Sequence, residues 1–248
     1  QTLVPYPCTW TYRIPWRVHA YVGSFLSQAA LPLLSIPILL MLRTPQSASQ
    51  SASESSGRSL IQILMMPRYM LAVAAGVVSY GLMAFVMTAA PIAMVNTGHS
   101  VDSAALGIQW HLLAMFAPSF VTGRLMTRFG KERVTAAGML LIAVSAIVAL
   151  AGLELINFWG SLAIMGIGWN FSFIGATAMV TDCHTPGERA KAQGANDFMV
   201  FGTTAAVSFL AGSVLHNSGW AAINWLLFPP VALILVPLLW QAARKPQA

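Results

Sequence analysis

Apolar residues in this chain fall into long blocks, which short polar connections separate. Seven of these blocks are long enough to cross a membrane, at residues 18–42, 70–95, 104–126, 134–153, 158–181, 194–215 and 221–242. A helix of about 20 apolar residues spans the hydrocarbon core of a bilayer, and a helix satisfies its own backbone hydrogen bonds there. The pattern therefore predicts seven transmembrane helices in an all-α integral membrane protein.

The composition supports this fold class. Hydrophobic residues make up 57% of the 248 residues and charged residues 8%, against roughly 25% charged residues in an ordinary soluble domain. The net charge of +6 is not evidence for a nucleic-acid partner, because the basic residues punctuate the apolar blocks instead of clustering on one face. The first block is too long for a signal peptide and is not followed by a cleavage site. The chain begins with Gln1 and not with Met. We therefore expect an N-terminal portion to be missing.

The distribution of basic residues among the connections indicates the orientation of the chain in the membrane. Every second connection contains Lys or Arg: Arg43, Arg58 and Arg68; Arg124, Arg128, Lys131 and Arg133; Arg189 and Lys191; and Arg244 and Lys245 in the tail. The connections between them have none. Cytoplasmic loops carry the excess of basic residues, so we expect these loops and the C-terminus inside the cell. Arg13 and Arg17 are an exception, because they precede the first block on the side that this orientation places outside the cell.

The segment between the first two blocks predicts a division into domains. Residues 46–57 read QSASQSASESSG, a tract that cannot bury enough apolar area to fold. An apolar stretch at 60–66 follows and suits a short interfacial helix. We expect an unassigned segment at 1–17, one span at 18–42, a cytoplasmic linker with the interfacial helix at 43–69, a six-helix block at 70–243 and a cytoplasmic tail at 244–248.

Residues 123–133, GRLMTRFGKER, resemble the loop signature G-x-L-x-D-R-x-G-x-R-R of the major facilitator superfamily. The positions that match in type or charge are Gly123, Leu125, Arg128, Gly130, Lys131 and Arg133. Thr127 stands where the family has an acid. In that family the acid and an arginine lock neighbouring helix ends, and the signature is usually degraded in the second half of the protein. A loop that is basic only because it is cytoplasmic remains an alternative.

The next basic loop, residues 182–194, carries a capping box, with Thr185 followed three residues later by Glu188 and with Pro186 at the first helical position. It is similar to the family pattern P-x-x-x-R-x-x-x-x-G, with Arg189 one residue away from the arginine position. Because Thr127 cannot supply the acid, the resemblance implies that Arg128 lies near Asp182 or Glu188. Neighbouring residues 182–184 cannot all ligate one ion, so we predict no metal and no cofactor.

The resemblance extends over most of the chain. Residues 66–94 look like the seventh helix of bacterial members and residues 166–182 like the tenth. Under this alignment the seven spans correspond to helices six to twelve. The resemblance implies one helix plus a six-helix half-bundle, in a multi-pass protein of the bacterial inner (plasma) membrane. It also implies transport of a small-molecule substrate by alternating access, which requires the missing N-terminal half or a partner chain.

Candidate cavity residues lie on two spans. Tyr80, Met83 and Met87 recur at helical spacing, and methionine repacks easily around varied ligands; helix packing is the alternative. A midplane Asn170 needs a partner, so it either bonds a neighbouring helix or faces a wet cavity. The spacing of 170, 173 and 177 predicts that Asn170, Phe173 and Thr177 share one face.

His111 lies within the third block and is a possible proton carrier because its pKa is ordinarily near neutral; a hydrogen-bonded packing histidine is the alternative. None of the seven acids is at the middle of a span. A proton site, if the protein has one, would therefore belong to the missing half.

The sequence bears on two alternatives to transport. An intramembrane enzyme would need a constellation such as HExxH or GxSxG, and the sequence contains neither, so we predict that the protein is not an enzyme. A non-transporting membrane fragment of a truncated reading frame is compatible with the start at Gln1. The sequence does not define the substrate, the direction of transport or a coupling ion.

Overall fold

The computed structural model describes residues 26, 29–30, 32–37, 40–41 and 57–244. The described residues between 26 and 41 are helical and belong to a unit separate from the rest of the chain, which begins at Ser53. Within that first unit, the Ser35 hydroxyl donates a hydrogen bond to the Pro32 carbonyl oxygen at 2.6 Å. Most of the predicted span at 18–42, the segment 1–17 and the Ser-rich tract up to residue 56 lie outside the described residues.

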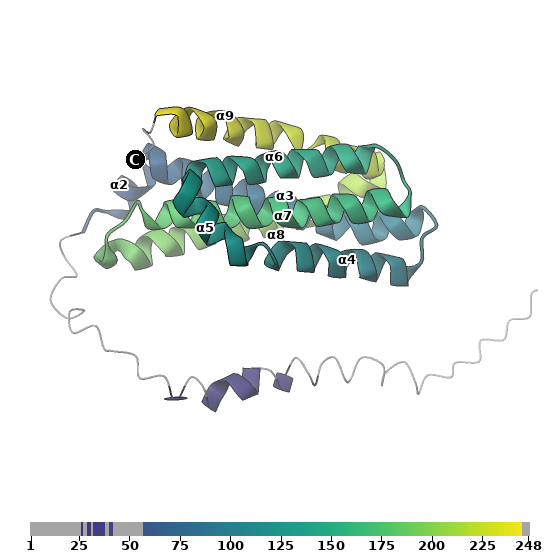
Figure 1. The fold of residues 1–248 in the computed structure, drawn as a ribbon, viewed down its shortest axis with the longest axis horizontal. Coiled ribbons are helices and arrows are strands. Elements are labelled where there is room, and N and C mark those ends of the chain that lie inside the picture. The colour runs from purple at the N-terminus through teal and green to yellow at the C-terminus, as the bar shows by residue number, and fades with distance from the viewer. Residues whose placement is uncertain (1–25, 27–28, 31, 38–39, 42–56, 245–248) are drawn as a thin grey trace, which may run out of the picture. The chain divides into compact units, whose positions relative to one another are not determined.

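The second unit is a bundle of helices that run side by side (Figure 1). Its elements are α2 (Leu60–Leu64), α3 (Pro67–Asn96), α4 (Val101–Phe116), α5 (Ser119–Phe129), α6 (Lys131–Leu150), α7 (Leu155–Thr181), the short 3₁₀ helix η1 (Pro186–Glu188), α8 (Arg189–Trp225) and α9 (Phe228–Arg244). The described residues include no strand. The predicted all-α fold is confirmed, and a helix is present in the stretch at 60–66.

Four helical stretches of the described residues are long and apolar enough to cross a membrane: Pro67–Asn96, Lys131–Leu150, Leu155–Thr181 and Pro186–Ala243. A fifth results if α4 and α5 together form one bent span. The six blocks predicted between residues 70 and 242 lie mostly in helices; the exceptions are residues 117–118, 151–153 and 226–227.

The longest stretch, Pro186–Ala243, has 58 residues. As an unbroken helix it would be about 87 Å long at 1.5 Å per residue, about three times the thickness of a bilayer core. The helix is broken at Gly219, whose φ of 76° and ψ of 179° are not helical. This φ lies in the region that glycine adopts without steric cost. The chain turns back near this residue, and α9 packs along α6 (Figure 1).

The third predicted span, 104–126, is not one continuous helix. α4 ends at Phe116 and α5 begins at Ser119, and the two helices are bent by 41°. Pro118 lies at the break, where it removes a backbone donor and obstructs the preceding turn. The hydrophobic pattern alone does not distinguish a straight span from a broken one.

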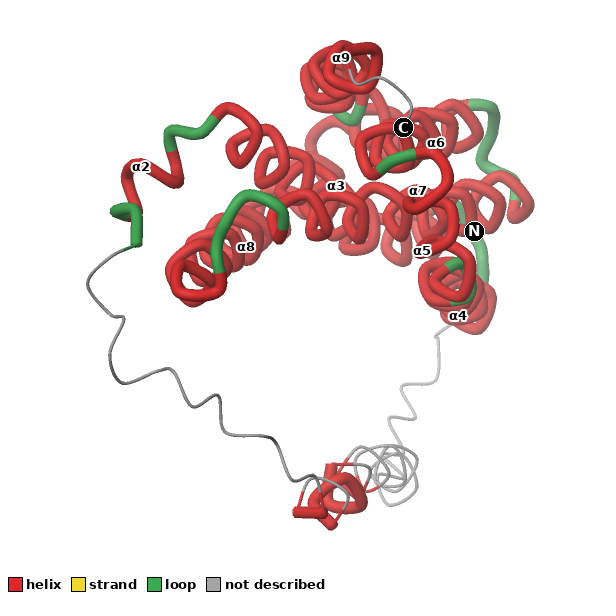
Figure 2. The backbone as a smooth tube through the Cα atoms, turned by 60° about the vertical axis from the view of Figure 1, so that its left-hand side comes forward, coloured by secondary structure: helices red, strands yellow, loops and turns green. Residues whose placement is uncertain are grey.

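Helix α7 is the central helix of the bundle and packs against α3, α4 and α6 (Figure 2). Glycines allow these close approaches, as in other membrane bundles. A Cβ atom added at Gly166 would lie 2.6 Å from the His111 carbonyl oxygen of α4, and one added at Gly138 of α6 would collide with the backbone of Ser172. α8 packs on the far side of α3, so the order of neighbouring helices is α8, α3, α7, α4.

Candidate functional site

Four aromatic side chains from three helices form a cluster. Tyr80 comes from α3, Trp169 and Phe173 from α7, and Phe201 from α8. The Tyr80 ring centroid lies 5.7 Å from that of Trp169, 5.1 Å from Phe173 and 5.5 Å from Phe201, each in an edge-on arrangement. Trp169 and Phe173 are stacked, with centroids 5.0 Å apart and planes 18° apart. We call these four residues the aromatic cluster.

The aromatic cluster is buried on the side of Trp169 and exposed on the side of Phe201. Trp169 is 8% exposed, Tyr80 and Phe173 are half-buried, and Phe201 is 53% exposed. The Trp169 Nε1 atom is buried, and no hydrogen-bond partner for it occurs in the part of the chain that the structure describes. Such a surface suits a planar aromatic ligand, because aromatic rings favour offset-stacked or edge-to-face neighbours at 4.5–7 Å.

Two of the predicted cavity residues, Tyr80 and Phe173, meet in this cluster, while Trp169 and Phe201 were not predicted as cavity residues. The signal for Trp169 was available, because it lies four residues before Phe173 and shares its helix face. Of the other candidates, Met83 and Thr177 are half-buried, and Met87 packs against the hydrophobic core.

Asn170 contacts α4 and α5 instead of the aromatic cluster, and it is fully buried. Its Nδ2 donates to the Met115 carbonyl oxygen at 2.8 Å and lies 2.7 Å from Ser119 Oγ. Its Oδ1 accepts from the Thr122 hydroxyl at 2.5 Å. Of the two alternatives raised by the sequence, the structure shows the bond to a neighbouring helix, and this geometry gives no support to Asn170 as a cavity-lining residue.

His111 is also buried, with Nδ1 2.8 Å from the Leu162 carbonyl oxygen. No partner for Nε2 occurs within the described residues. The bond from α4 to α7 is the kind that a packing histidine makes, and a role in proton transfer stays a prediction.

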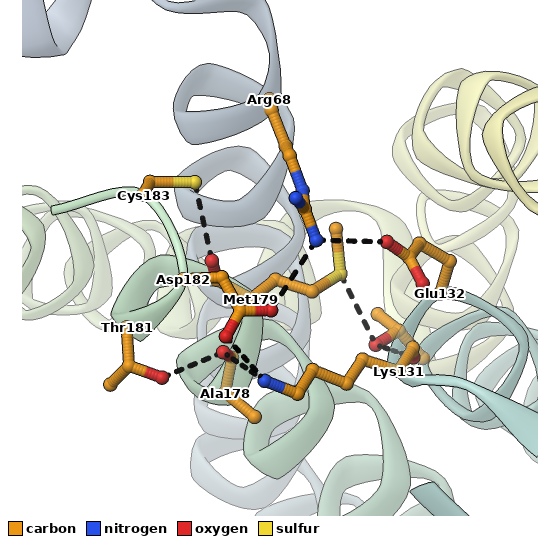
Figure 3. A network of polar contacts seen from close by, with 9 residues as sticks. Arg68, Lys131, Glu132, Ala178, Met179, Thr181, Asp182 and Cys183 are labelled. Carbon is orange, nitrogen blue, oxygen red and sulfur yellow. Dashed lines mark hydrogen bonds and ion pairs between the residues drawn. The ribbon is translucent and has the colours of Figure 1, made fainter. Parts of the chain in front are cut away.

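An ion-pair network of Arg68, Lys131, Glu132 and Asp182 joins three helix ends (Figure 3). We call this end of the bundle the charged end. Arg68, near the start of α3, has its Nη2 3.3 Å from Asp182 Oδ2 and 3.4 Å from Glu132 Oε1. Lys131, the first residue of α6, places Nζ 2.6 Å from Asp182 Oδ1 and 3.1 Å from the Ala178 carbonyl oxygen. The network therefore links the start of α3, the start of α6 and the end of α7.

A second pair joins Arg58 to Glu188, which lies at the start of α8. The Arg58 backbone N–H donates to Glu188 Oε1 at 2.8 Å, and its Nη2 lies 2.7 Å from Oε2. The predicted capping box is present, and Glu188 Oε2 accepts from the Thr185 N–H at 3.0 Å. The Arg58 guanidinium, followed by these backbone donors, holds the pKa of Glu188 well below its usual range.

The signature loop forms a turn, but its arginine does not make the expected pair. Gly130 caps α5 with a φ of 88°, a conformation that favours glycine, whereas a Cβ at Gly123 would meet nothing within 4 Å. The ion pairs of Asp182 and Glu188 go to Arg68, Lys131 and Arg58. The Arg128 guanidinium instead lies 5.2 Å from the ring centroid of its neighbour Phe129.

Of the other basic residues of these loops, Arg133 is half-buried, whereas Arg124, Arg189 and Lys191 are exposed. Sequence reasoning used Arg58 and Arg68 only to set the orientation and missed both pairs. Arg68 follows Pro67 at the first turn of α3, which places it at a helix end beside other helix ends. No group of three metal-ligating side chains occurs in the part of the chain described.

Comparison with known proteins identifies the family. The family model of the Major Facilitator Superfamily matches residues 71–248. The chain is 66% identical over 226 residues to the riboflavin transporter RfnT of Brucella anthropi, a match covering 91% of this chain and 57% of the relative. It is 33% identical over 165 residues to the uncharacterized MFS-type transporter YdeG of Bacillus subtilis, covering 65% of this chain and 38% of the relative.

A third relative, the uncharacterized MFS-type transporter YddS of Bacillus subtilis, is 31% identical over 166 residues, which cover 66% of this chain and 38% of the relative. The chain thus spans about half, or less, of the length of the curated relatives it matches. The family is one of membrane transporters and not of enzymes. Because its model matches well over half of the chain, the protein belongs to the Major Facilitator Superfamily.

Proposed function

We propose that this chain provides the C-terminal half of a riboflavin transporter. The observation that carries the proposal is the 66% identity to a riboflavin transporter across 91% of the chain. Substrates differ widely among proteins of one fold, so the family alone would not name a ligand.

The aromatic cluster supports a flavin as the ligand. The isoalloxazine of riboflavin is a planar, fused aromatic ring system, and the half-buried faces of Tyr80 and Phe173 beside exposed Phe201 offer it stacking and edge contacts. Each such contact contributes about 0.5–1.5 kcal/mol beyond its buried area. We assign the ring to this cluster, with Met83 and Thr177 at its margins.

The mechanism in this proposal is alternating access, with no covalent chemistry. The two halves of such a transporter rock about a substrate that is bound between them. The second half is the missing N-terminal portion or a partner chain. We place the protein in the bacterial inner membrane with the charged end of the bundle and the C-terminus in the cytoplasm, following the distribution of basic residues.

Uptake of labelled riboflavin tests the proposal. The full-length protein is expressed in a riboflavin-requiring bacterial strain that lacks its own riboflavin transporter, and accumulation of the label is measured. We expect growth at low riboflavin and uptake that excess unlabelled riboflavin blocks. Protein that reaches the membrane but neither supports growth nor accumulates the label would contradict the proposal.

A further inference from the structure

The break between α4 and α5 leaves backbone groups that need partners. Pro118 has no N–H, and α4 ends two residues before it, so carbonyl oxygens of the last turn of α4 lack the donors that a continuous helix would provide. Within a membrane, water does not replace those donors, and an unsatisfied carbonyl is strongly unfavourable. The broken span is therefore stable only where a neighbouring helix supplies hydrogen bonds.

Asn170 of α7 supplies them to both sides of the break. Its Nδ2 donates to the Met115 carbonyl oxygen, in the last turn of α4, and lies within hydrogen-bond distance of Ser119 Oγ, at the first residue of α5. Its Oδ1 accepts from Thr122, one turn further into α5, whose hydroxyl also lies 2.8 Å from the Pro118 carbonyl oxygen. One fully buried amide thus holds both helices at their relative angle of 41°.

The same helix faces the aromatic cluster. Trp169 immediately precedes Asn170, and Phe173 follows three residues later. Adjacent residues of a helix point in directions about 100° apart. Asn170 of α7 therefore contacts the broken span, whereas Trp169 and Phe173 of the same helix contact the Tyr80 ring. A shift or rotation of α7 that accompanies a change in the cluster must therefore move or break the bonds of Asn170.

The far end of α5 carries the signature loop. α5 is only 11 residues long and ends at Phe129, and Gly130 alone separates it from α6. Any change in the angle between α4 and α5 therefore displaces residues 123–130 relative to the start of α4. The bend is the mechanical connection between the interior of the bundle and that loop.

We propose that Asn170 is a positioning residue that clamps the bend between α4 and α5 and couples it to α7, so that the aromatic cluster and the signature loop move together. The residue acts on the conformational step and not as a substrate contact. The clamp itself rests on the geometry of the break and not on the identity of the substrate; its effect on transport rests on the proposed function.

The test combines hydrogen exchange with transport kinetics in the full-length protein. Asn170→Ala removes the whole clamp, and Thr122→Val removes one bond with little change in volume. Thr122→Ser keeps the hydroxyl and is the conservative rescue. Ser145→Ala is the matched control, because Ser145 is a buried hydroxyl of α6 that donates to the Ile142 carbonyl of its own helix.

We expect Asn170→Ala and Thr122→Val to accelerate amide exchange in the peptide covering residues 113–123 while peptides from α6 and α9 stay unchanged. Thr122→Ser and Ser145→Ala should exchange like the unmodified protein. For riboflavin uptake we expect kcat to fall about tenfold in Asn170→Ala with KM within about twofold, the pattern of a lost interaction that does not bind the substrate.

Unchanged exchange across the break in both Asn170→Ala and Thr122→Val would overturn the clamp. A raised KM with unchanged kcat would also overturn it, because Asn170 would then act on the substrate. If the unmodified protein does not transport riboflavin, the proposed function fails, and the exchange measurement still decides the clamp by itself.

Discussion

Arg58 and Glu188 lie 130 residues apart in the sequence and are joined by a two-pronged ion pair. The Arg58 Nε and Nη2 atoms lie 2.9 and 2.7 Å from the two carboxylate oxygens of Glu188. A further bond runs from Arg58 Nη2 to the Cys183 carbonyl oxygen at 3.1 Å. The segment before α2 is thus fixed to the turn between α7 and α8.

The first prediction concerns the pH dependence of this pair. The pKa of Glu188 in the folded protein lies well below the ordinary value of 4.5. A lowered folded-state pKa means that the stabilisation is present above the unfolded-state pKa and declines as the pH falls below it. We therefore expect Glu188→Gln, which preserves the capping box, to lower the thermal unfolding temperature at pH 7. The effect should be clearly smaller at about pH 2.5, because the stabilisation is lost gradually between the unfolded-state pKa and the lowered folded-state pKa.

Unfolding in detergent, followed by tryptophan fluorescence, measures this difference. Glu154→Gln is the control, because Glu154 is an exposed acid that precedes α7 at the other end of that helix. It should behave like the unmodified protein at both pH values. A Glu188→Gln defect of equal size at pH 7 and at about pH 2.5 would show that the charge of Glu188 is not what stabilises the contact.

The second prediction compares the two bases of the network in Figure 3. Arg68 contacts two acids, of which Glu132 is almost fully buried, whereas Lys131 contacts the partly exposed Asp182. Exposed pairs contribute about 0–1 kcal/mol, and weakening the bonds of a buried charged group costs about 1–3 kcal/mol. We expect Arg68→Ala to destabilise the protein more than Lys131→Ala.

Chemical denaturation in mixed micelles gives both free energies of unfolding. Arg124→Ala is the control, because Arg124 is an exposed base of the signature loop that takes no part in the ion pairs of this network. Equal losses for Arg68→Ala and Lys131→Ala would mean that the pair between Arg68 and Glu132 adds no stability.

The fold class was predictable from the sequence because lipid exposure and helix formation both leave a strong pattern. A continuous block of about 20 apolar residues matches the length of a membrane-spanning helix, which satisfies its own backbone groups in lipid. The blocks between residues 70 and 242 are mostly helical. The turn at Gly130 was also predictable, because a glycine followed by charged residues at a helix end favours a sharp reversal of the chain.

The site was less predictable because helical periodicity groups residues without saying which neighbour they face. Asn170 and Phe173 are separated by about 60° around α7, and this small difference sends one to the broken span and the other to Tyr80. The partners of Asp182 depend on the order of helices in space. That order brings Arg68 and Lys131 beside Asp182, while Arg128 lies over Phe129.

The third prediction concerns the close packing of α4 on α7. A methyl group at Gly166 would lie 2.6 Å from the His111 carbonyl oxygen and 2.9 Å from the Met115 backbone nitrogen. These atoms belong to helix backbone, so the two helices would have to separate. Overpacking of this kind costs about 1–3 kcal/mol or more, and we expect Gly166→Ala to lower both the unfolding temperature and the yield of folded protein.

Gly212→Ala is the matched control for this effect. A Cβ atom at Gly212 of α8 meets no atom within 4 Å, and alanine is favoured over glycine within a helix by about 1 kcal/mol. Gly212→Ala should therefore be neutral or stabilising. Equal tolerance of both substitutions would show that α4 and α7 are not in tight contact at this point.

The last prediction tests whether the aromatic cluster binds the flavin ring. Tyr80 touches all three other rings of the cluster and is half-buried. Removal of its ring should weaken riboflavin binding by the loss of stacking and of apolar contact, about 1–3 kcal/mol in all. This corresponds to a rise in KM of roughly fivefold to a hundredfold, whereas Tyr80→Phe keeps the ring and should leave KM almost unchanged.

Phe209→Ala is the control, because it removes an exposed aromatic ring that is not expected to contact the flavin. Phe209 is a highly exposed aromatic residue of α8, eight residues beyond Phe201 and outside the cluster, and its removal should leave KM as it is. Uptake of labelled riboflavin over a range of concentrations gives KM and kcat for each variant, with membrane expression measured in parallel. A Tyr80→Ala protein that transports riboflavin with an unaltered KM would place the flavin elsewhere, because a ring in contact with the ligand cannot be removed without changing its affinity.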